Sequence, residues 1–463
     1  MTKSFMPAVL AAAVLAGCSL TPDYERPAAP VPAAWPDDAR SSGARSLRGL
    51  DWNAFFPDER LRALITLALA HNRDLRIATA RVAEARALYG IQRADRLPSV
   101  AAGLSQSAAR TPADLSPGGV STVNRRVDAN VSLLPFELDF WGRVASLGEA
   151  AQASYLATEH AQQAFRLSLV ASVADGYLAE LEAAERLVLA RETQASRERT
   201  RELVDRRRAA GLAGDMDYLQ ADAAFEGARA EVAALTRQHA AARNYLQALV
   251  GTAPAGLPPG RTLAEQGLPQ DLQAELPSEV LVQRPDILAA EQRLRAANAN
   301  IGAARAAFFP RITLTAAVGT ASRELDGLFE GGSRAWSFAP SLSLPIFNHG
   351  RNRASLDLAE VRRDIAVAEY ERAIQQAFRE VADLLAAREQ LAEQQQALQA
   401  QERAQQRASD IAEARYNQGV GSFLEVLDAQ RQLFAVRQTL LQVRRALWSS
   451  SAQLYKALGG AQG

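Results

Sequence analysis

The sequence has little cysteine, histidine and methionine, and no excess of either charge. Of 463 residues, one is cysteine, four are histidine and three are methionine. A single cysteine excludes an intramolecular disulfide. The histidines lack metal-ligand spacing, and neither a phosphate-binding glycine loop nor a nucleophile elbow occurs. Lys+Arg and Asp+Glu each number 52, so the basic excess of a nucleic-acid binder is missing. We therefore expect no enzyme, no metal or other cofactor, and no nucleic-acid partner.

Proline is absent from two long blocks, 136–253 and 346–463. Ala, Gln, Glu, Arg and Leu dominate both blocks, and this composition is typical of long helices. The stretches 144–208 and 352–417 each predict a helix of roughly 100 Å. Their apolar residues recur at helical spacing, which indicates seams for packing against other helices.

The N-terminus predicts a secreted chain with a lipid anchor. An apolar run, 5–16, follows Lys3 and is too short to span a membrane, so 1–17 is interpreted as a signal peptide. The residues "LAGC" that end at Cys18 resemble the bacterial lipobox, which implies acylation of Cys18 as the first mature residue. Ser19 then favours the outer membrane. A plain signal peptide with a coincidental cysteine is the alternative. Residues 18–57 are rich in proline and predict an extended strap.

The sequence contains an internal repeat. Residues 73–100 match 284–312, and the identical residues are paired at a constant offset of 212. Examples of the matched pairs are Asp74 and Asp286, Gly90 and Gly302, and Pro98 and Pro310. We interpret 58–251 and 283–460 as two repeats, joined by a proline-containing linker or equatorial segment, 252–282. Each repeat begins with a helix, which is expected at 58–95 in the first and 285–308 in the second.

Each repeat next carries two segments in which apolar and small polar residues alternate. Alternation over about ten residues is typical of strands between lipid and a watery lumen, although a half-buried hairpin in a soluble domain gives the same pattern. Four strands cannot close a membrane barrel, whereas two copies would give eight strands and three copies twelve with an open lumen. A symmetric oligomer is therefore expected. The predicted strands are 98–108, 125–135, 310–321 and 334–344.

Several motifs in order along the chain resemble the TolC-like outer-membrane factor family, in its OprM/NodT-type lipoprotein branch. They include "GCSLTPDYERPAAPVP" (17–32), "ELDFWGR" (137–143), "IGAARAAFFPRITL" (301–314) and "YNQGVGSFLEVLDAQR" (416–431). The resemblance implies a mainly α fold with a transmembrane β-barrel: a homotrimer with a twelve-stranded barrel continuous with a long periplasmic α-helical barrel. It implies the outer-membrane exit channel of a tripartite, RND-type efflux pump for small molecules. Its partners would be a periplasmic adaptor protein and an inner-membrane transporter.

Glycines interrupt each long helical block, and we expect the chain to turn there. Residues 207–222 match 415–430 at an offset of 208, which pairs Gly211 with Gly419. Glycine suits the left-handed backbone of such turns. By resemblance, the tips form a periplasmic gate and an adaptor-docking end. Gly421 stands where relatives place an arginine, so the gate bonds differ here. The tip and docking glycines are Gly211, Gly214, Gly419 and Gly421; the gate residues are Asp217, Arg415, Tyr416 and Asp428.

Two alternatives stay open. The first is the outer-membrane duct of a type I protein secretion system, since a duct need not select its cargo. The second is a periplasmic coiled-coil lipoprotein that forms no channel. The acids at the tips also fit ordinary solvated helix faces.

Overall fold

The computed structural model describes residues 19–32, 35, 51–267 and 281–460, with the backbone alone at 45–46 and 272–273. It divides into two compact units, each described here by itself. Unit 1 comprises Met1–Ala28, Arg81–Glu159 and Ala289–Tyr370; unit 2 comprises Ala29–Ala80, His160–Leu288 and Glu371–Gly463.

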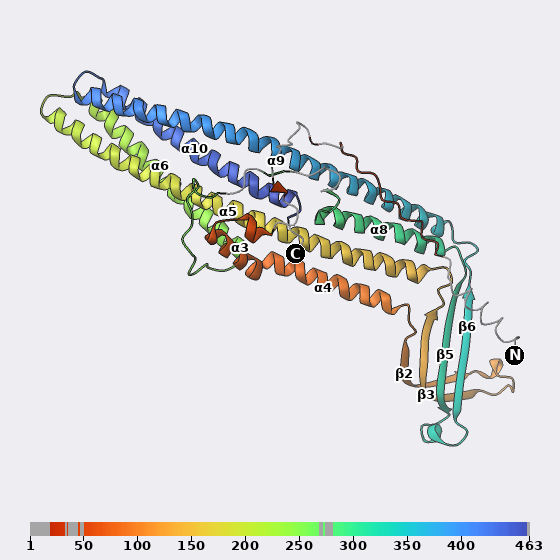
Figure 1. The fold of residues 1–463 in the computed structure, drawn as a ribbon. Helices are drawn as coiled ribbons and strands as arrows, with labels where there is room; N and C mark the ends of the chain where they lie inside the picture. Colours follow the sequence, from red (N-terminus) through yellow and green to blue (C-terminus); the bar gives the residue numbers. More distant parts are fainter. Residues whose placement is uncertain are drawn as a thin grey trace. The chain divides into compact units, whose positions relative to one another are not determined.

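The same order of elements occurs twice along the chain: helix, β-hairpin, a very long helix and a returning helix (Figure 1). The first half comprises β1 (Arg45–Ser46), α2 (Trp52–Phe55), α3 (Glu59–His71), α4 (Arg73–Ala94), β2 (Val100–Thr111), η1 (Ala113–Leu115), β3 (Thr122–Glu137), α5 (Arg143–Ala209) and α6 (Asp215–Val250). The second comprises β4 (Leu272–Gln273), α8 (Pro285–Ala306), β5 (Arg311–Ser322), η2 (Asp326–Phe329), β6 (Arg334–Ser343), α9 (Arg351–Asn417) and α10 (Phe423–Ala457).

Unit 1 holds an antiparallel sheet with the strand order β2-β3-β5-β6. The two hairpins thus pair through β3 and β5, one strand from each repeat. Beside the sheet, α5 and α8 pack through small side chains, which let two helix backbones approach closely. Their buried contact residues are Ala150, Ala153, Ala296 and Ala299.

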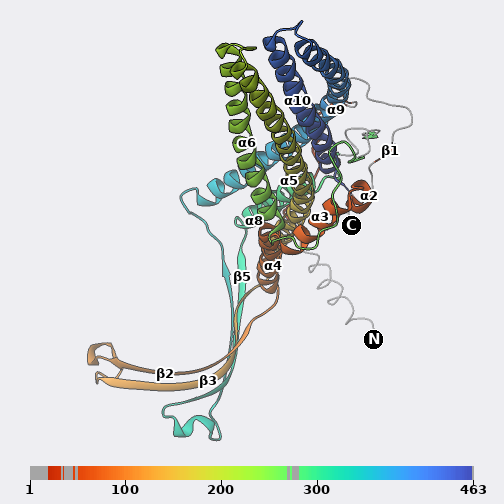
Figure 2. The same cartoon turned by 90° about the vertical axis from the view of Figure 1, so that its left-hand side faces the viewer.

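Unit 2 holds two helical hairpins, α5 with α6 and α9 with α10, that lie side by side (Figures 1 and 2). Ion pairs join α5 to α10: Arg445 of α10 lies 2.8 Å from the Glu182 carboxylate, which also pairs at 3.1 Å with Arg186 of its own helix, α5. Arg445 also contacts Asp175 at 3.2 Å. At the base of the hairpins, Phe55 stacks on Tyr455 with 4.8 Å between ring centroids.

A buried carboxylate ties this base together. Asp58 is fully buried and caps the N-terminus of α3, since its side chain accepts hydrogen bonds from the backbone N–H groups of residues 60 and 61. Its other oxygen accepts from the Tyr177 hydroxyl at 2.9 Å, from the Arg261 backbone N–H at 3.1 Å and from Gln266 Nε2 at 3.1 Å. The pKa of Tyr177 is raised by its burial and by the charge of Asp58. One carboxylate therefore joins α3, α5 and the segment after α6.

The structure corrects two expectations. The helix expected at 58–95 is two helices, because Asn72 breaks it with an extended backbone. Asn72 Oδ1 accepts from the Leu75 N–H at 2.8 Å, so it caps α4, and its Nδ2 donates to the Leu249 carbonyl at 2.8 Å. The strap expected over 18–57 is not extended throughout: α2 lies within it, and Phe55 and Phe56 are fully buried. Residues 1–18, including the signal peptide and Cys18, lie outside the described residues.

The strands differ from their expected bounds by only a few residues. β2 and β3 extend to 111 and back to 122, where 108 and 125 were expected, because both strands continue as a two-stranded ribbon beyond the last pair with β5, Val127 and Ser322.

Replacing Tyr177 with Phe tests the role of Asp58. We expect the substitution to destabilise the fold by about 1.5–3 kcal/mol, because a buried carboxylate loses a hydrogen bond. Urea unfolding followed by helical circular dichroism measures the change. Tyr245→Phe is the matched control, since Tyr245 is 56% exposed. Equal stability of the two variants would contradict this account of Asp58.

Candidate functional site

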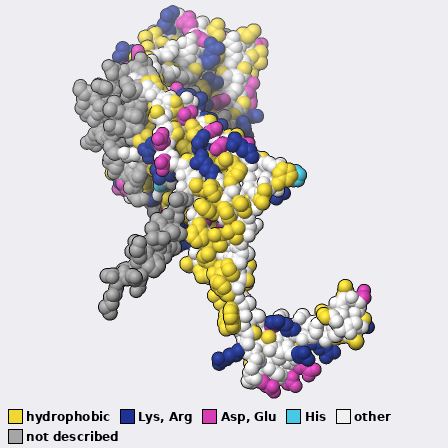
Figure 3. Space-filling model, turned by 90° about the vertical axis from the view of Figure 1, so that its right-hand side faces the viewer, with side chains coloured by type: hydrophobic (Ala, Val, Ile, Leu, Met, Phe, Trp, Pro, Cys, Tyr) yellow, Lys and Arg dark blue, Asp and Glu magenta, His cyan; other side chains and the backbone are white. Residues whose placement is uncertain are grey.

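One face of the sheet carries large apolar side chains that are exposed. The register places Val131, Val318 and Trp336 in one row across β3, β5 and β6. Their exposed fractions are 48%, 64% and 80%, which is unusual for a surface facing water. Figure 3 shows hydrophobic side chains along the sheet and charged side chains at the end that carries the hairpin loops.

The opposite face carries small and polar side chains. One residue further along, Ser132, Ala317 and Ser337 form the neighbouring row. Nearby, the hydroxyl oxygens of Thr313 and Ser341 lie 2.6 Å apart in a hydrogen bond. Apolar side chains toward lipid and small polar ones toward water are what the wall of a membrane barrel requires.

The two helical hairpins turn through the same backbone motif. Gly211 has φ 71° and Gly419 has φ 75°, so both adopt the left-handed conformation that the sequence predicts. After α5, the Gly211 N–H donates to the Arg208 carbonyl and the next N–H to the Arg207 carbonyl. After α9, the Gly419 and Val420 N–H groups repeat this pattern. This is a Schellman ending at both tips.

The other two tip glycines have ordinary backbone angles, and their roles differ. Gly214 is the N-cap of α6, with φ −83°, and among the described residues no neighbour lies within 4 Å of a Cβ added there. At Gly421 an added Cβ would lie 3.0 Å from Arg415 Cβ. Gly421 therefore lets the turn fold back closely onto the end of α9. Ser422 then caps α10 by accepting from the Glu425 N–H.

An apolar cluster joins the two tips. Val204 of α5 is fully buried and packs with Ala221 of α6 and Phe423 of α10. Tyr416 packs against this cluster, with its ring centroid 5.3 Å from that of Phe423. The Arg207 guanidinium lies 5.0 Å from the Tyr416 ring centroid, a cation–π contact between the hairpins.

The predicted gate residues all lie at the tips, yet one chain does not bring them together. Asp428 accepts from Arg431 at 2.5 Å and Gln432 at 2.6 Å, both on its own helix. Arg415 donates to the Val420 carbonyl at 3.5 Å. Within the described part of the chain, Asp217 makes no ion pair or side-chain hydrogen bond. Among the described residues, Tyr416 is the one of the four with a recorded contact to the other hairpin, through Arg207 and the Val204 cluster.

Sequence reasoning missed the cluster itself. Val204 and its neighbour Leu203 are the two apolar residues in a charged run, "RTRELVDRRR" (199–208), and give little signal of a buried cluster. Phe423 follows the capping Ser422 and could have been recognised as the first apolar residue of α10. Arg208, whose guanidinium lies 4.1 Å from the Tyr218 ring centroid, was also overlooked.

The sheet faces and the long paired helices define a class, the outer-membrane channels with helical extensions. The family model described as "Outer membrane efflux protein" matches residues 64–252 and 276–460. The chain therefore belongs to the outer membrane efflux protein family.

Relatives and solved structures agree with this assignment. Outer membrane protein OprJ of Pseudomonas aeruginosa is 47% identical over 454 residues, 98% of this chain and 95% of the relative. Toluene efflux pump outer membrane protein TtgF of Pseudomonas putida is 47% identical over 469 residues, 99% and 97% of the two chains. The open state of the Neisseria gonorrhoeae MtrE outer membrane channel has a TM-score of 0.87 at 40% identity, covering 96% of this chain and 98% of that one.

The predicted family, fold class, efflux function and outer-membrane location are thereby confirmed. The chain is an outer-membrane efflux channel. Within the described residues, no helix has both the length and the apolar character needed to cross a membrane.

Alanine substitutions separate the two kinds of tip glycine. We expect Gly419→Ala to weaken its turn by about 1–2 kcal/mol, because a side chain disfavours the left-handed backbone. Hydrogen exchange of amides 415–421 in the purified protein should then accelerate roughly 5–30-fold. Gly214→Ala is the control and should leave exchange at its own tip unchanged. Similar acceleration in both variants would contradict the distinction.

Proposed function

We propose that this channel is the exit duct of a tripartite, RND-type efflux pump, and that it works as a homotrimer. The observation that carries the proposal is the four-stranded sheet with one apolar exposed face and one small polar face. Such a sheet fits a segment of a barrel wall. Three segments give twelve strands, enough to leave a lumen, whereas eight strands would be filled by side chains.

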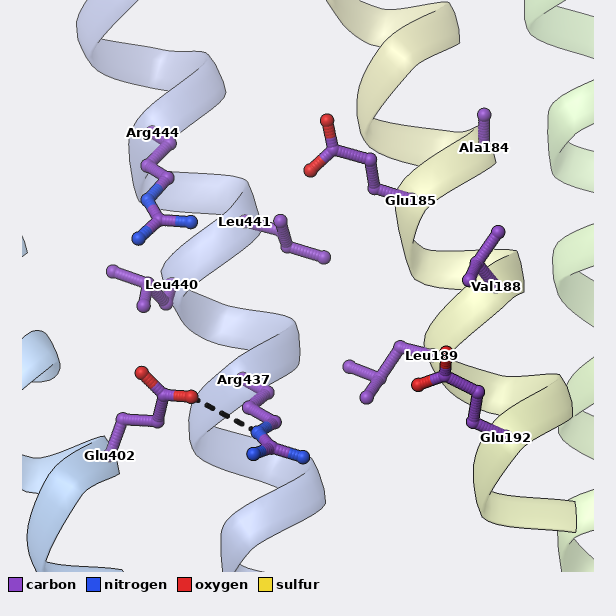
Figure 4. A pocket seen from close by; sticks show the side chains of 10 residues that line it. All are labelled: Ala184, Glu185, Val188, Leu189, Glu192, Glu402, Arg437, Leu440, Leu441 and Arg444. Carbon is purple, nitrogen blue, oxygen red and sulfur yellow. Dashed lines mark hydrogen bonds and ion pairs between the residues drawn. The ribbon is translucent and has the colours of Figure 1, made fainter. Parts of the chain in front are cut away.

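The proposed partners are a periplasmic adaptor and an inner-membrane transporter. Tripartite pumps need a protein that joins the duct to the transporter, and the helix tips at Gly211 and Gly419 offer one docking end. A groove between α5 and α10 supports a second contact for an adaptor helix. Its volume is about 490 Å³, and its lining is shown in Figure 4.

The chemistry of this groove suits an amphipathic helix. Its apolar lining includes Val188 and Leu189 of α5 and Leu440 of α10. Charged side chains surround it, and Glu402 accepts from Arg437 at 3.1 Å (Figure 4). An apolar floor with a charged rim is the pattern used for helix-in-groove recognition.

The proposed substrates are small organic molecules. Relatives carry the names toluene efflux pump, solvent efflux pump and antibiotic efflux pump outer membrane protein. We extend that class of substrate to this chain on the strength of its 44–47% identity over nearly the whole length. Transport of a protein, as in type I secretion, is the second candidate. We propose no enzymatic activity.

We also propose a lipid anchor at the N-terminus and a gate at the helix tips. We infer that Cys18 carries covalent lipid, on its lipobox-like context alone. We further propose that Asp217, Arg415, Tyr416 and Asp428 line a periplasmic constriction formed between copies. The charged groups of Asp217, Arg415 and Asp428 are exposed or half-buried, and in the described part of one chain they do not pair with one another, which supports this role.

Expression in a strain that lacks its own efflux channel tests the function. With an RND transporter and its adaptor present, we expect resistance to toluene and to antibiotics to rise several-fold above an empty vector. Minimum inhibitory concentrations measure the effect, and outer-membrane fractions confirm assembly. Unchanged resistance despite assembled channels would reject small-molecule efflux, and secretion of a co-expressed type I substrate would favour the second candidate.

Single-channel conductance in planar bilayers tests the gate. We expect Asp428→Ala combined with Tyr416→Phe to raise conductance, because the constriction loses a charge and a hydroxyl. The matched control is Asp410→Ala with Tyr245→Phe, which changes the same residue types on exposed helix faces. If the tip variant conducts like the control, these residues do not form the gate.

A further inference from the structure

An extended N-terminal segment lies along α8 in unit 1. Two hydrogen bonds hold the backbone of this segment, and a third holds the side chain of Thr21. Asn298 Nδ2 donates to the Pro22 carbonyl at 2.7 Å, and Arg305 Nη1 donates to the Leu20 carbonyl at 3.4 Å. The Thr21 hydroxyl lies 2.9 Å from the hydroxyl of Ser146, on α5. Residues 20–26, the docked segment, therefore contact both repeats.

A buried carboxylate holds the other end of the docked segment. Glu291 of α8 has 2% of its side chain exposed and pairs with Arg26, with 2.8 Å between Oε2 and Nη2. Arg295 and the Tyr24 hydroxyl donate to its other oxygen at 2.9 and 3.2 Å. Burial raises the pKa of Glu291, but hydrogen bonds from Arg295 and Arg26 outweigh it and lower that pKa below its usual range. Burial, with the Glu291 charge, raises the pKa of Tyr24 to about 12.

The Glu291 carboxylate is therefore protonated only at acidic pH. A carboxyl whose pKa is lowered in the folded state stabilises that state above its unfolded pKa, and the contribution is lost as pH falls through the folded pKa. At neutral pH the carboxylate is charged. Removing its charge while Arg26 and Arg295 remain would leave the two cations facing each other.

A glycine on α8 makes room for the segment. A Cβ added at Gly302 would lie 2.2 Å from Thr21 Oγ1 and 2.7 Å from Ser146 Oγ, and 2.9 Å from Thr21 Cα. The last contact is with backbone, so rotation of the Thr21 side chain alone cannot relieve the clash. Even alanine at this position is incompatible with the docked segment.

The duplicated helix in the first repeat lacks this site. At the offset of 212, Thr79 and Arg86 of α4 stand at the positions of Glu291 and Asn298. Gly90 stands at the position of Gly302, and among the described residues nothing lies within 4 Å of a Cβ added there. The two helices share a fold and an ancestral pattern, but only α8 carries the carboxylate and amide that hold a peptide.

We propose that α8 carries a docking site for an extended peptide, that residues 20–26 occupy it, and that it sets how far the N-terminal anchor can lie from the sheet. With Leu20 held, two peptide units allow Cys18 to reach only about 7 Å further. Undocked, the roughly 30 residues before α2 could span about 100 Å. Arg305 lies in the last turn of α8, shortly before β5, so docking holds Leu20 near the start of that strand.

The consequence for a lipid anchor rests on the proposed acylation of Cys18, whereas the docking site does not. If Cys18 is acylated, its chains enter the bilayer beside the sheet rather than at the end of a long tether. If it is not, the docked segment still holds Leu20 at that place.

A spin label two residues beyond the docked segment tests the site in the full-length, detergent-solubilised protein. Ala28→Cys provides the label position, since Cys18 is the chain's single native cysteine. Mass spectrometry of the labelled protein reports separately whether Cys18 is lipidated or reacts with the label. Electron paramagnetic resonance spectra should show an immobilised nitroxide in this parent protein.

Two variants should release the segment and two controls should not. Gly302→Ala and Glu291→Gln are expected to convert most of the spectrum to a mobile component, through the steric clash and the lost charge. Gly90→Ala matches the first substitution on α4, and Glu149→Gln matches the second at an exposed position. A mobile label in the parent, or an immobilised label in Gly302→Ala, would overturn the proposal. Gly302→Ala decides alone if Glu291→Gln does not fold.

Discussion

The unpaired backbone of the two edge strands is the constraint on which the rest of this protein depends. Its sheet has the order β2-β3-β5-β6, so the outer sides of β2 and β6 have no partner strand within the described chain. In a bilayer no water can satisfy those N–H and C=O groups. The apolar face that carries Val318 and Trp336 nevertheless suits lipid and not water. Both conditions are met when β6 of one copy pairs with β2 of the next.

The helical part fits the same requirement for symmetric copies. Each chain presents two hairpins that turn through equivalent glycines, and the apolar contact of Val204 with Phe423 joins their tips. Ion pairs from Arg445 of α10 to Glu182 and Asp175 of α5 join the two helices further along. These contacts hold the two hairpins of one chain against each other. Within the described part of one chain, Asp217, Arg415 and Asp428 do not pair with one another, so the proposed constriction requires contacts between chains.

Features that repeat in the sequence could be predicted, because two copies report on one structure. The strands, long helices and glycine turns appear twice, at offsets of 212 and 208. Features that occur once were missed. The sequence around Asp58 indicates a helix cap. It does not indicate that Tyr177 and Gln266, which are distant in sequence, donate hydrogen bonds to the same carboxylate. Glu291 lies within a helical pattern, and its pairing with Arg26 spans most of the chain. Such pairs depend on tertiary packing, which periodicity does not encode.

The copy number of the channel in lipid tests the central claim most directly. Native mass spectrometry of the protein released from lipid nanodiscs counts the chains in one assembly without reference to transport. The account predicts one dominant species of three chains, which supplies twelve strands and leaves no open edge. A dominant species of one or two chains that still forms conducting pores would contradict it.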